Sequence, residues 1–126
     1  MPLKRILDPS RVRRIKGGFS FIPHRFLTDG FVKALDRDEL LLYLFLVLAS
    51  DRYGLSYYND GSICSLLGLS PGEYDDARRG LIARDLIAFD GRLFQVLELP
   101  VSPAGPVPKP PAKLTRLLRK VGKELP

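Results

Sequence analysis

The chain has 126 residues, of which 45% are apolar, and a formal net charge of +6. This size and composition predict one globular domain with a modest core. Cys64 is the only cysteine and His24 the only histidine, which excludes an intramolecular disulfide and makes a zinc site of Cys and His ligands implausible. We therefore expect no metal and no other cofactor. The longest apolar run, Leu40 to Ala49, has half of the roughly 20 residues that span a bilayer, so we expect a cytoplasmic protein.

The positive charge is confined to the two ends of the sequence. Residues 1–28 contain seven Lys or Arg and one Asp, for a net charge of +6. Residues 100–126 contain six Lys or Arg and one Glu, for a net charge of +5. Residues 29–99 contain seven basic and twelve acidic side chains, for −5. Basic flanks attract polyanions such as nucleic acid, although they also serve as solubilising tails or bind protein partners.

The two ends differ from the middle in composition as well as in charge. Residues 1–18 combine basic side chains with two prolines and a Gly-Gly end, which predicts a basic N-terminal arm. Six prolines between residues 100 and 111 predict an extended linker over 100–112. Over 113–126, four apolar residues recur at helical spacing among basic ones, which predicts a short basic amphipathic segment. Its apolar face is small, so we do not expect it to bind a membrane.

The folded region is expected over residues 19–99. Pro23 can begin a short helix near its start. A longer helix is predicted from about 37 to 51, because Asp36 can cap it and Glu39 can complete a capping box. The helix is apolar on every face from Leu40 to Leu48, so it should be central in the core or share its extra face with another copy. The apolar anchors ahead of it are expected to be Phe21, Ile22, Phe26, Leu27, Phe31 and Leu35.

A short strand is predicted at residues 55–58, followed by a short helix. Asn59 or Asp60 can cap this helix, and Gly68 can adopt the left-handed conformation that ends it. Tyr57 and Tyr58 alternate along the strand, which predicts one side chain in the core and one outside. The inward residues of the short helix are expected to be Ile63, Cys64 and Leu67.

The next helix has three independent start signals. Ser70 can cap it, Pro71 suits its first turn, and Glu73 follows the cap by three residues. The helix should end near Asp85. Its inward residues are expected to be Tyr74, Ala77 and Leu81.

A β-hairpin is predicted after this helix. Asp90-Gly91 lies between two runs of strand-forming residues, and the pair favours a two-residue type I′ turn with positive φ at both positions. In that register, Phe89 lies opposite Arg92, Ala88 opposite Leu93 and Ile87 opposite Phe94.

The segment from Ile63 to Ile87 resembles the winged helix-turn-helix family, with residues 67–70 in the turn and Leu86-Ile87 entering the wing. The resemblance implies a mainly α fold with a small β-hairpin, a winged helix-turn-helix flanked by basic arms. The region beginning with FIPHRFL is more loosely similar to the N-terminal domain of phage and plasmid replication initiators and to small winged-helix proteins of mobile elements. These resemblances imply a non-enzymatic protein that binds double-stranded DNA, as a transcriptional regulator or as a replication or mobile-element accessory factor.

In this family the second helix of the turn enters the major groove, and the wing touches the backbone or the minor groove. The resemblance places Gly72, Glu73, Asp75, Asp76 and Arg79 towards the groove, and three of these five are acidic, which phosphate repels. We therefore expect the affinity to come mainly from the basic flanks, helped by the arginines of the folded region. The expected DNA-binding residues are Arg5, Arg11, Arg13, Arg14, Lys16, Arg78, Arg79, Arg84, Arg92, Lys113, Arg116, Arg119 and Lys120.

Two other functions are open at this stage. The acidic second helix can instead dock on a protein, because a fold by itself does not settle function. Alternatively, the domain is a dimerisation core whose tails bind acidic partners. Catalysis is not expected, because Asp75 and Asp76 point about 100° apart on a helix and cannot share a proton. No glycine pattern supports a nucleotide site, and we expect no small-molecule substrate.

Overall fold

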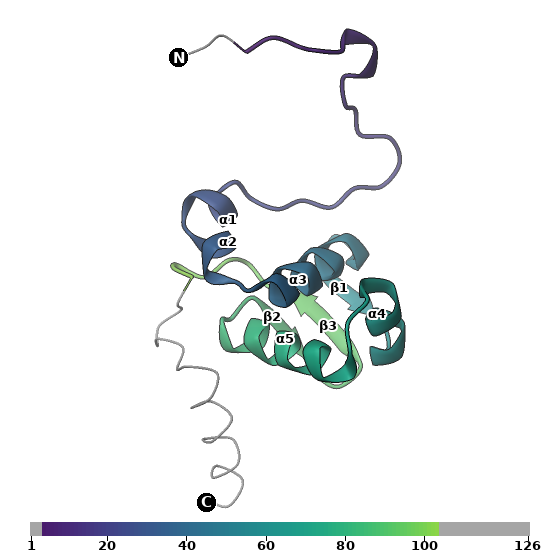
Figure 1. The fold of residues 1–126 in the computed structure, drawn as a ribbon, viewed down its shortest axis with the longest axis vertical. Coiled ribbons are helices and arrows are strands. Elements are labelled where there is room, and N and C mark those ends of the chain that lie inside the picture. The colour runs from purple at the N-terminus through teal and green to yellow at the C-terminus, as the bar shows by residue number, and fades with distance from the viewer. Residues whose placement is uncertain (1–3, 104–126) are drawn as a thin grey trace, which may run out of the picture.

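A computed structural model describes residues 4–103 of the chain. The predicted segment at 113–126 and most of the predicted linker at 100–112 lie outside these residues. The described chain is mainly helical, with a small three-stranded antiparallel sheet (Figure 1). In chain order, its α-helices and strands are α1 (Arg25–Thr28), α2 (Phe31–Ala34), α3 (Arg37–Ala49), β1 (Leu55–Tyr57), α4 (Asp60–Leu67), α5 (Pro71–Ala83), β2 (Ile87–Phe89) and β3 (Leu93–Val96).

The long helix α3 starts where its sequence predicts, because its first turn is capped locally. The Asp36 carboxylate accepts the N–H of Glu39 at 2.8 Å, and the Glu39 carboxylate accepts the N–H of Asp36 at 2.9 Å. The helix ends at Ala49, two residues before the predicted end. Its inner side is central in the core, since Leu42 and Leu46 are fully buried and the helix packs against α5.

A tight turn joins α4 to α5. The Asn59 side chain caps α4, and the helix ends at Gly68, whose φ of 67° is left-handed as predicted. Ser70 and Glu73 form the predicted capping box at the start of α5, which ends at Ala83, two residues before the predicted end. Burial confirms the inward side of α5, formed by Tyr74, Ala77 and Leu81. The inward side predicted for α4 is fully buried at Ile63 and half-buried at Cys64 and Leu67.

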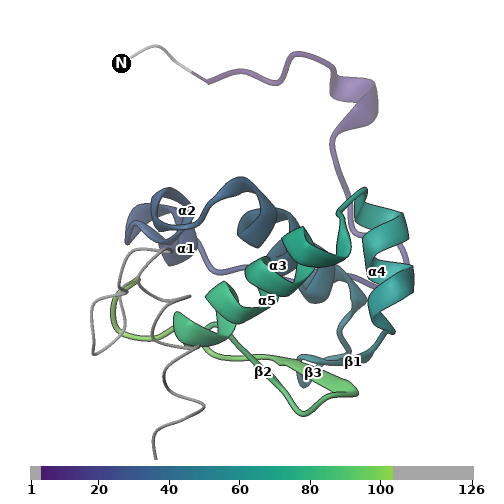
Figure 2. The same cartoon turned by 60° about the horizontal axis from the view of Figure 1, so that its bottom comes forward.

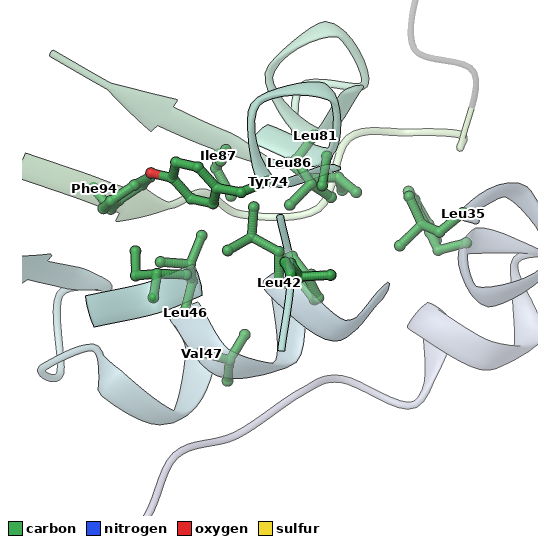
Figure 3. Packing of buried hydrophobic residues seen from close by; sticks show 14 of the residues in the cluster. Leu35, Leu42, Leu46, Val47, Tyr74, Leu81, Leu86, Ile87 and Phe94 are labelled. Carbon is green, nitrogen blue, oxygen red and sulfur yellow. The ribbon is translucent and has the colours of Figure 1, made fainter. Parts of the chain in front are cut away.

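The sheet has the order β1-β3-β2, and α3 and α5 lie across one of its faces (Figure 2). Its central strand contributes Phe94, which is fully buried. Figure 3 shows Leu42 and Leu46 of α3 facing the side chains of α5 and β3 in one continuous cluster. The three-stranded sheet therefore forms one wall of the core and the two longest helices form the other.

The β2–β3 hairpin is confirmed, but the predicted turn and register are wrong. Gly91 has a positive φ and Asp90 does not, and Phe89 pairs with Phe94 instead of lying opposite Arg92. The Asp90 carboxylate accepts the N–H groups of Leu93 and Arg92 at 2.7 and 2.9 Å, which stabilises a longer loop and lowers the pKa of this carboxyl. The shift brings the rings of Phe89 and Phe94 to 4.3 Å and removes a charged side chain from opposite Phe89. The other pairs become Ala88 with Gln95 and Ile87 with Val96.

Two short helices, α1 and α2, attach the N-terminal part of the chain to the core. The Phe26 ring stacks on those of Phe31 and Tyr43, with centroids 6.0 and 4.9 Å apart, which joins α1 to α2 and α3. Among the predicted anchors, Phe26, Phe31 and Leu35 are buried and Ile22 is half-buried. Phe21 and Leu27 are exposed, so the prediction is wrong for these two. The reason is that only one side of α1 and of the segment before it faces the body.

Gly54 allows a close backbone approach between the turn before β1 and the end of β3. Its φ of 83° is left-handed, and its carbonyl accepts the N–H of Val96 at 2.8 Å. A Cβ atom at position 54 would lie 2.5 Å from the Val96 carbonyl oxygen. A side chain here would therefore push β3 away from this turn.

We expect Gly54→Ala to lower the free energy of unfolding by at least about 2 kcal/mol, because the left-handed backbone penalty adds to the clash. Urea denaturation followed by circular dichroism measures this. Gly72→Ala is the matched control, because a Cβ at that position meets no atom within 4 Å and alanine favours the helix by up to about 1 kcal/mol. Equal stabilities for the two variants would contradict the close approach at Gly54.

Candidate nucleic-acid interface

The predicted DNA-binding cations occupy three different environments. The first group is exposed on the arm, the second is tied into ion pairs within the body, and the third is exposed on the body. They are Arg5, Arg11, Arg13, Arg14 and Lys16 on the arm; Arg78 and Arg84 in the ion pairs; and Arg79 and Arg92 on the body surface. Lys113, Arg116, Arg119 and Lys120 lie outside the described residues.

The N-terminal arm leaves the body at α1 and extends away from it (Figure 1). Every side chain from Lys4 to Phe19 is exposed. The arm contains one 3₁₀ turn, Pro9–Arg11, in which the Asp8 carboxylate accepts the N–H and the hydroxyl of Ser10. Within residues 4–103, no cation of the arm forms an ion pair with an acidic side chain. These charges are available to a polyanion.

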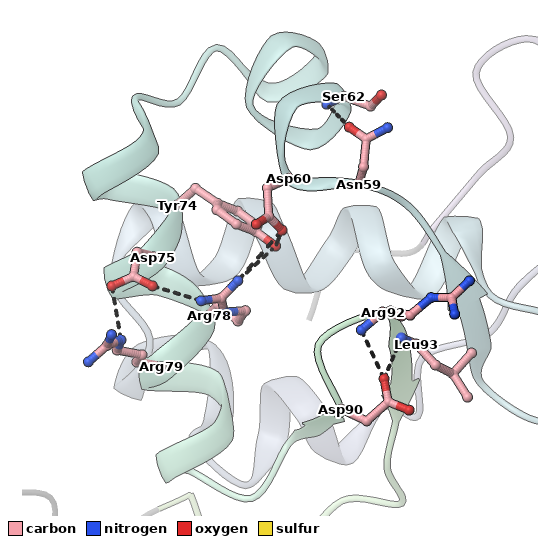
Figure 4. A network of polar contacts seen from close by, with 10 residues as sticks. All are labelled: Asn59, Asp60, Ser62, Tyr74, Asp75, Arg78, Arg79, Asp90, Arg92 and Leu93. Carbon is pink, nitrogen blue, oxygen red and sulfur yellow. Dashed lines mark hydrogen bonds and ion pairs between the residues drawn. The ribbon is translucent and has the colours of Figure 1, made fainter.

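Arg78 is held inside the body by several contacts (Figure 4). Its guanidinium lies 2.7 Å from the Asp75 carboxylate and 3.6 Å from that of Asp60, and it donates to the Tyr74 hydroxyl at 3.4 Å. It also lies over the Phe89 ring, 4.8 Å from the centroid, and its side chain is only 17% exposed. Arg78 thus connects α4, α5 and β2, and its contribution is to the fold.

Tyr74 completes this network on the inner side of α5. Its hydroxyl donates to the Asp60 carboxylate at 2.6 Å. Burial, followed by this hydrogen bond, raises the pKa of Tyr74 to about 12. The phenol is therefore a neutral donor at any physiological pH, and the interaction holds the start of α4 against α5.

Arg84 is also committed to the fold. Its Nε lies 3.2 Å from the Glu39 carboxylate, and the two side chains are 14% and 1% exposed. Glu39 is on α3 and Arg84 directly follows α5, so the pair joins these two helices at one end. A buried carboxylate needs such a partner, because its desolvation is costly. Arg84 is not positioned as a surface cation.

Arg79 and Arg92 are the predicted cations that stay exposed on the body. Arg79 is 43% exposed and pairs with Asp75 at 2.9 Å. Arg92 lies on the β2–β3 turn, beside a shallow cavity of about 350 Å³. The cavity is lined by Tyr57, Tyr58, Asn59, Asp60, Gly91 and Arg92.

Both tyrosines of this cavity are exposed, so the prediction of one in the core is wrong. β1 is at the edge of the sheet and ends at Tyr57, and Ser56 is its buried residue. Tyr58 lies beyond the strand, where its ring meets that of Phe45 edge-on at 5.0 Å. The outer side of the β1–α4 junction is therefore aromatic and next to a cation.

The carboxylates at the start of α5 have structural roles. Glu73 accepts the N–H of Ser70 in the capping box, and this backbone hydrogen bond lowers the pKa of Glu73. Asp75 bridges two arginines through its two oxygens. Desolvation raises the pKa of Asp38 on α3, and the negative charges of Glu73 and Asp36 raise it further. The starts of α3 and α5 thus form one negative region.

The structural role of one side chain, Arg25, was missed from the sequence. Arg25 donates to the backbone carbonyls of Leu99, Pro100 and Val101 at 3.3, 2.7 and 3.3 Å, and it pairs with Asp29. These contacts hold the chain after β3 against α1, where the arm begins. No sequence signal marks them, because carbonyl groups are common to all residues and the partners lie 74 to 76 residues away. The segments leading to the two basic flanks therefore meet at α1.

Two kinds of feature are absent from the described residues. Within residues 4–103, no group of three or more His, Cys, Asp or Glu side chains is placed to hold a metal ion. In the same range, no helix has the length and apolar character needed to cross a membrane. Comparisons with protein-family models, curated proteins and solved structures found no match to this chain.

The two classes of arginine should respond differently to mutation. We expect Arg84→Ala to lower the free energy of unfolding by about 3 kcal/mol, because it leaves the Glu39 carboxylate buried without this partner. Arg79→Ala is the matched control on the same helical region and should change it by no more than about 0.5 kcal/mol, as is usual for an exposed pair. Urea denaturation at neutral pH measures both. If both variants lose the same free energy of unfolding, the Arg84–Glu39 pair does not stabilise the fold more than the exposed Arg79–Asp75 pair does.

Proposed function

We propose that residues 36–99 form a winged helix-turn-helix domain and that the protein binds double-stranded DNA. The order α3-β1-α4-α5-β2-β3 supports this, together with the tight α4–α5 turn and the sheet order β1-β3-β2. In this arrangement α5 is the helix that enters the major groove and the β2–β3 turn is the wing. The proposed role is that of a transcriptional regulator or of a replication or mobile-element accessory factor.

The proposal assigns most of the affinity to the arm. This assignment depends on one contrast. The cations of the arm are exposed, whereas Arg78 and Arg84 are paired with carboxylates inside the fold. α5 itself has three carboxylates and two arginines, so it brings no net positive charge to DNA. Phosphate contacts supply most non-specific affinity, and the arm has unpaired cations for them.

The body contributes orientation and a smaller number of contacts. Arg79 lies on the exposed side of α5, where a guanidinium can reach a base edge or a phosphate. Asp76 on the same side has the chemistry to accept from a cytosine amino group. Arg92 is at the tip of the proposed wing, where a cation meets the backbone or the minor groove. The domain thus orients the protein on DNA while the arm holds it there.

We expect the combined variant Arg11→Ala, Arg13→Ala and Arg14→Ala to weaken binding of the full chain to duplex DNA. If each arginine neutralises one phosphate, the slope of log affinity against log salt concentration should flatten by about 2.7, since each contact contributes about 0.9. Fluorescence anisotropy over a salt series measures it. The Arg→Lys triple variant is the control and should keep the slope, because the charges are retained. Unchanged binding by the alanine variant would refute binding led by the arm.

Single variants on the body test the orientation. We expect Arg79→Ala and Arg92→Ala each to flatten the salt slope by about 0.9. Arg52→Ala is the matched control, because Arg52 is an exposed arginine outside α5 and the hairpin, where it lies over the Tyr53 ring. If Arg52→Ala has the larger effect, DNA lies on a different side of the body from the one proposed.

A second candidate function is docking on a protein through α5. The negative region formed by Asp36, Asp38 and Glu73 favours it, because such a surface attracts a basic partner and repels phosphate. The salt series separates the two functions. If the full chain does not bind duplex DNA even at low salt, the DNA proposal is wrong and docking becomes the better interpretation.

A further inference from the structure

Within residues 4–103, the outer side of α3 is apolar and exposed. Leu41, Leu44 and Leu48 are 38%, 44% and 67% exposed. Successive residues of a helix are about 100° apart, so these three side chains share one side of α3, opposite to that of the buried Leu42 and Leu46. We call them the α3 outer face.

This face differs from the usual surface of a helix at the edge of a domain. Between Glu39 and Asp51 the sequence has no charged residue, whereas the solvent side of a surface helix is normally charged or polar. Single exposed leucines need no explanation, but a contiguous apolar surface is typical of an interaction site. The α3 outer face thus has the composition of an interface.

A charged side chain lies near each end of this face. Arg37 lies on the same side of the helix, one turn before Leu41, and is exposed. At the other end, Asp51 follows the helix and is exposed, with its Oδ1 fixed by the N–H groups of Tyr53 and Leu55. Arg37 stands between Asp36 and Asp38 in the sequence, and the exposed Arg52 follows Asp51. Of these, Arg37 lies in line with the leucines at one end of the face, and Asp51 lies just beyond the other end.

We propose that the α3 outer face binds the same face of a second copy of the chain, with the two helices antiparallel about a twofold axis. With Leu44 at the axis, Leu41 faces Leu48 of the second copy, and Arg37 faces Asp51 of the second copy. The twofold repeats each contact, so the interface has two ion pairs flanking a leucine centre. Arg37 of each copy can meet Asp51 of the other only in this antiparallel orientation.

The neighbouring segment adds to the area that such a dimer needs. Standard interfaces bury about 800 Å² on each partner, which is more than three leucines supply. The segment before α1 runs lengthwise past α3 (Figures 1 and 3), and Phe19 and Phe21 on it are 69% and 74% exposed. Aromatic side chains are large, so a second copy that also covers Phe19 and Phe21 would bury more area than the three leucines supply.

The geometry leaves the proposed DNA-binding elements uncovered. α5 and the sheet pack on the inner side of α3, so each copy would present α5 and its hairpin on the side away from the twofold axis. The dimer would also bring two basic arms into one particle. The inference does not depend on DNA binding, because it concerns the opposite side of α3 and is tested without DNA.

The test is the molar mass of the full chain in solution over a range of concentrations, measured by sedimentation equilibrium without DNA. We expect a concentration-dependent mass approaching twice 14.1 kDa. Leu44→Arg and Leu48→Arg should each weaken the association at least about tenfold. The first places two like charges together at the axis, and the second buries a charge against Leu41 of the second copy. Leu66→Arg is the matched control, because Leu66 on α4 is 64% exposed and outside the α3 outer face. Circular dichroism checks that all variants remain folded.

A cysteine variant tests the register directly. In a Cys64→Ser background, Leu44→Cys should form a disulfide between two copies on mild oxidation, because position 44 faces itself across the axis. Leu66→Cys in the same background should not. A full chain that stays at 14.1 kDa up to millimolar concentration would overturn the proposal, and would indicate that another segment, such as residues 113–126, covers the face. A dimer insensitive to both leucine variants would overturn it as well.

Discussion

The fold depends on one buried carboxylate, that of Glu39. One of its oxygens accepts the N–H of Asp36 and fixes the first turn of α3, and the other meets the Arg84 guanidinium at the end of α5. The same side chain therefore defines where α3 begins and how it lies against α5. Because α4 is tied to α5 through Tyr74 and Asp60, and β2 follows α5 directly, these elements are linked to α3 through that contact as well as through the core. A carboxylate that is 1% exposed is tolerated only where such partners are supplied.

The pairing of arginines within the fold also limits which cations are left for the proposed interface. Arginine suits buried ion pairs and nucleic-acid contacts for the same reason, a planar guanidinium with several donors. Arg78 and Arg84 are used for the first purpose, so they cannot be counted towards the second. The charge left for a polyanion lies chiefly on the arm, which has no core of its own and is anchored at α1. In the proposed interface, the arm would supply affinity and the body would supply orientation.

The two sides of α3 have different surroundings. The inner side is buried against α5 and the sheet, whereas the outer side is apolar without being covered within residues 4–103. In a domain of this size, a helix that is apolar on every side can bury only one of its sides, because two packed layers enclose a single core. The contacts that Arg37 and Asp51 of two copies would make are the reason for proposing a second copy as the partner.

Local chemistry in the sequence determined the boundaries of the main elements. The capping boxes at Asp36 and Ser70 and the left-handed Gly68 are interactions between residues at most four apart, so the sequence alone contains all their partners. The periodicity of α5 likewise identified its buried side. The hairpin was predictable as an element, since its two strands flank a turn-forming pair.

Only the tertiary structure decided the features that depend on distant residues. Stacking of Phe89 on Phe94 selected a longer hairpin loop over the two-residue turn that Asp90-Gly91 favours locally. The partners of Arg84 and Arg25 lie 45 and more than 70 residues away, and the partners of Arg78 include Asp60 and Phe89 on other elements. An arginine therefore looks equally available for DNA wherever it occurs in the sequence. Burial and pairing, which arise only when the chain folds, separate the arginines that hold the protein together from those left to bind a partner.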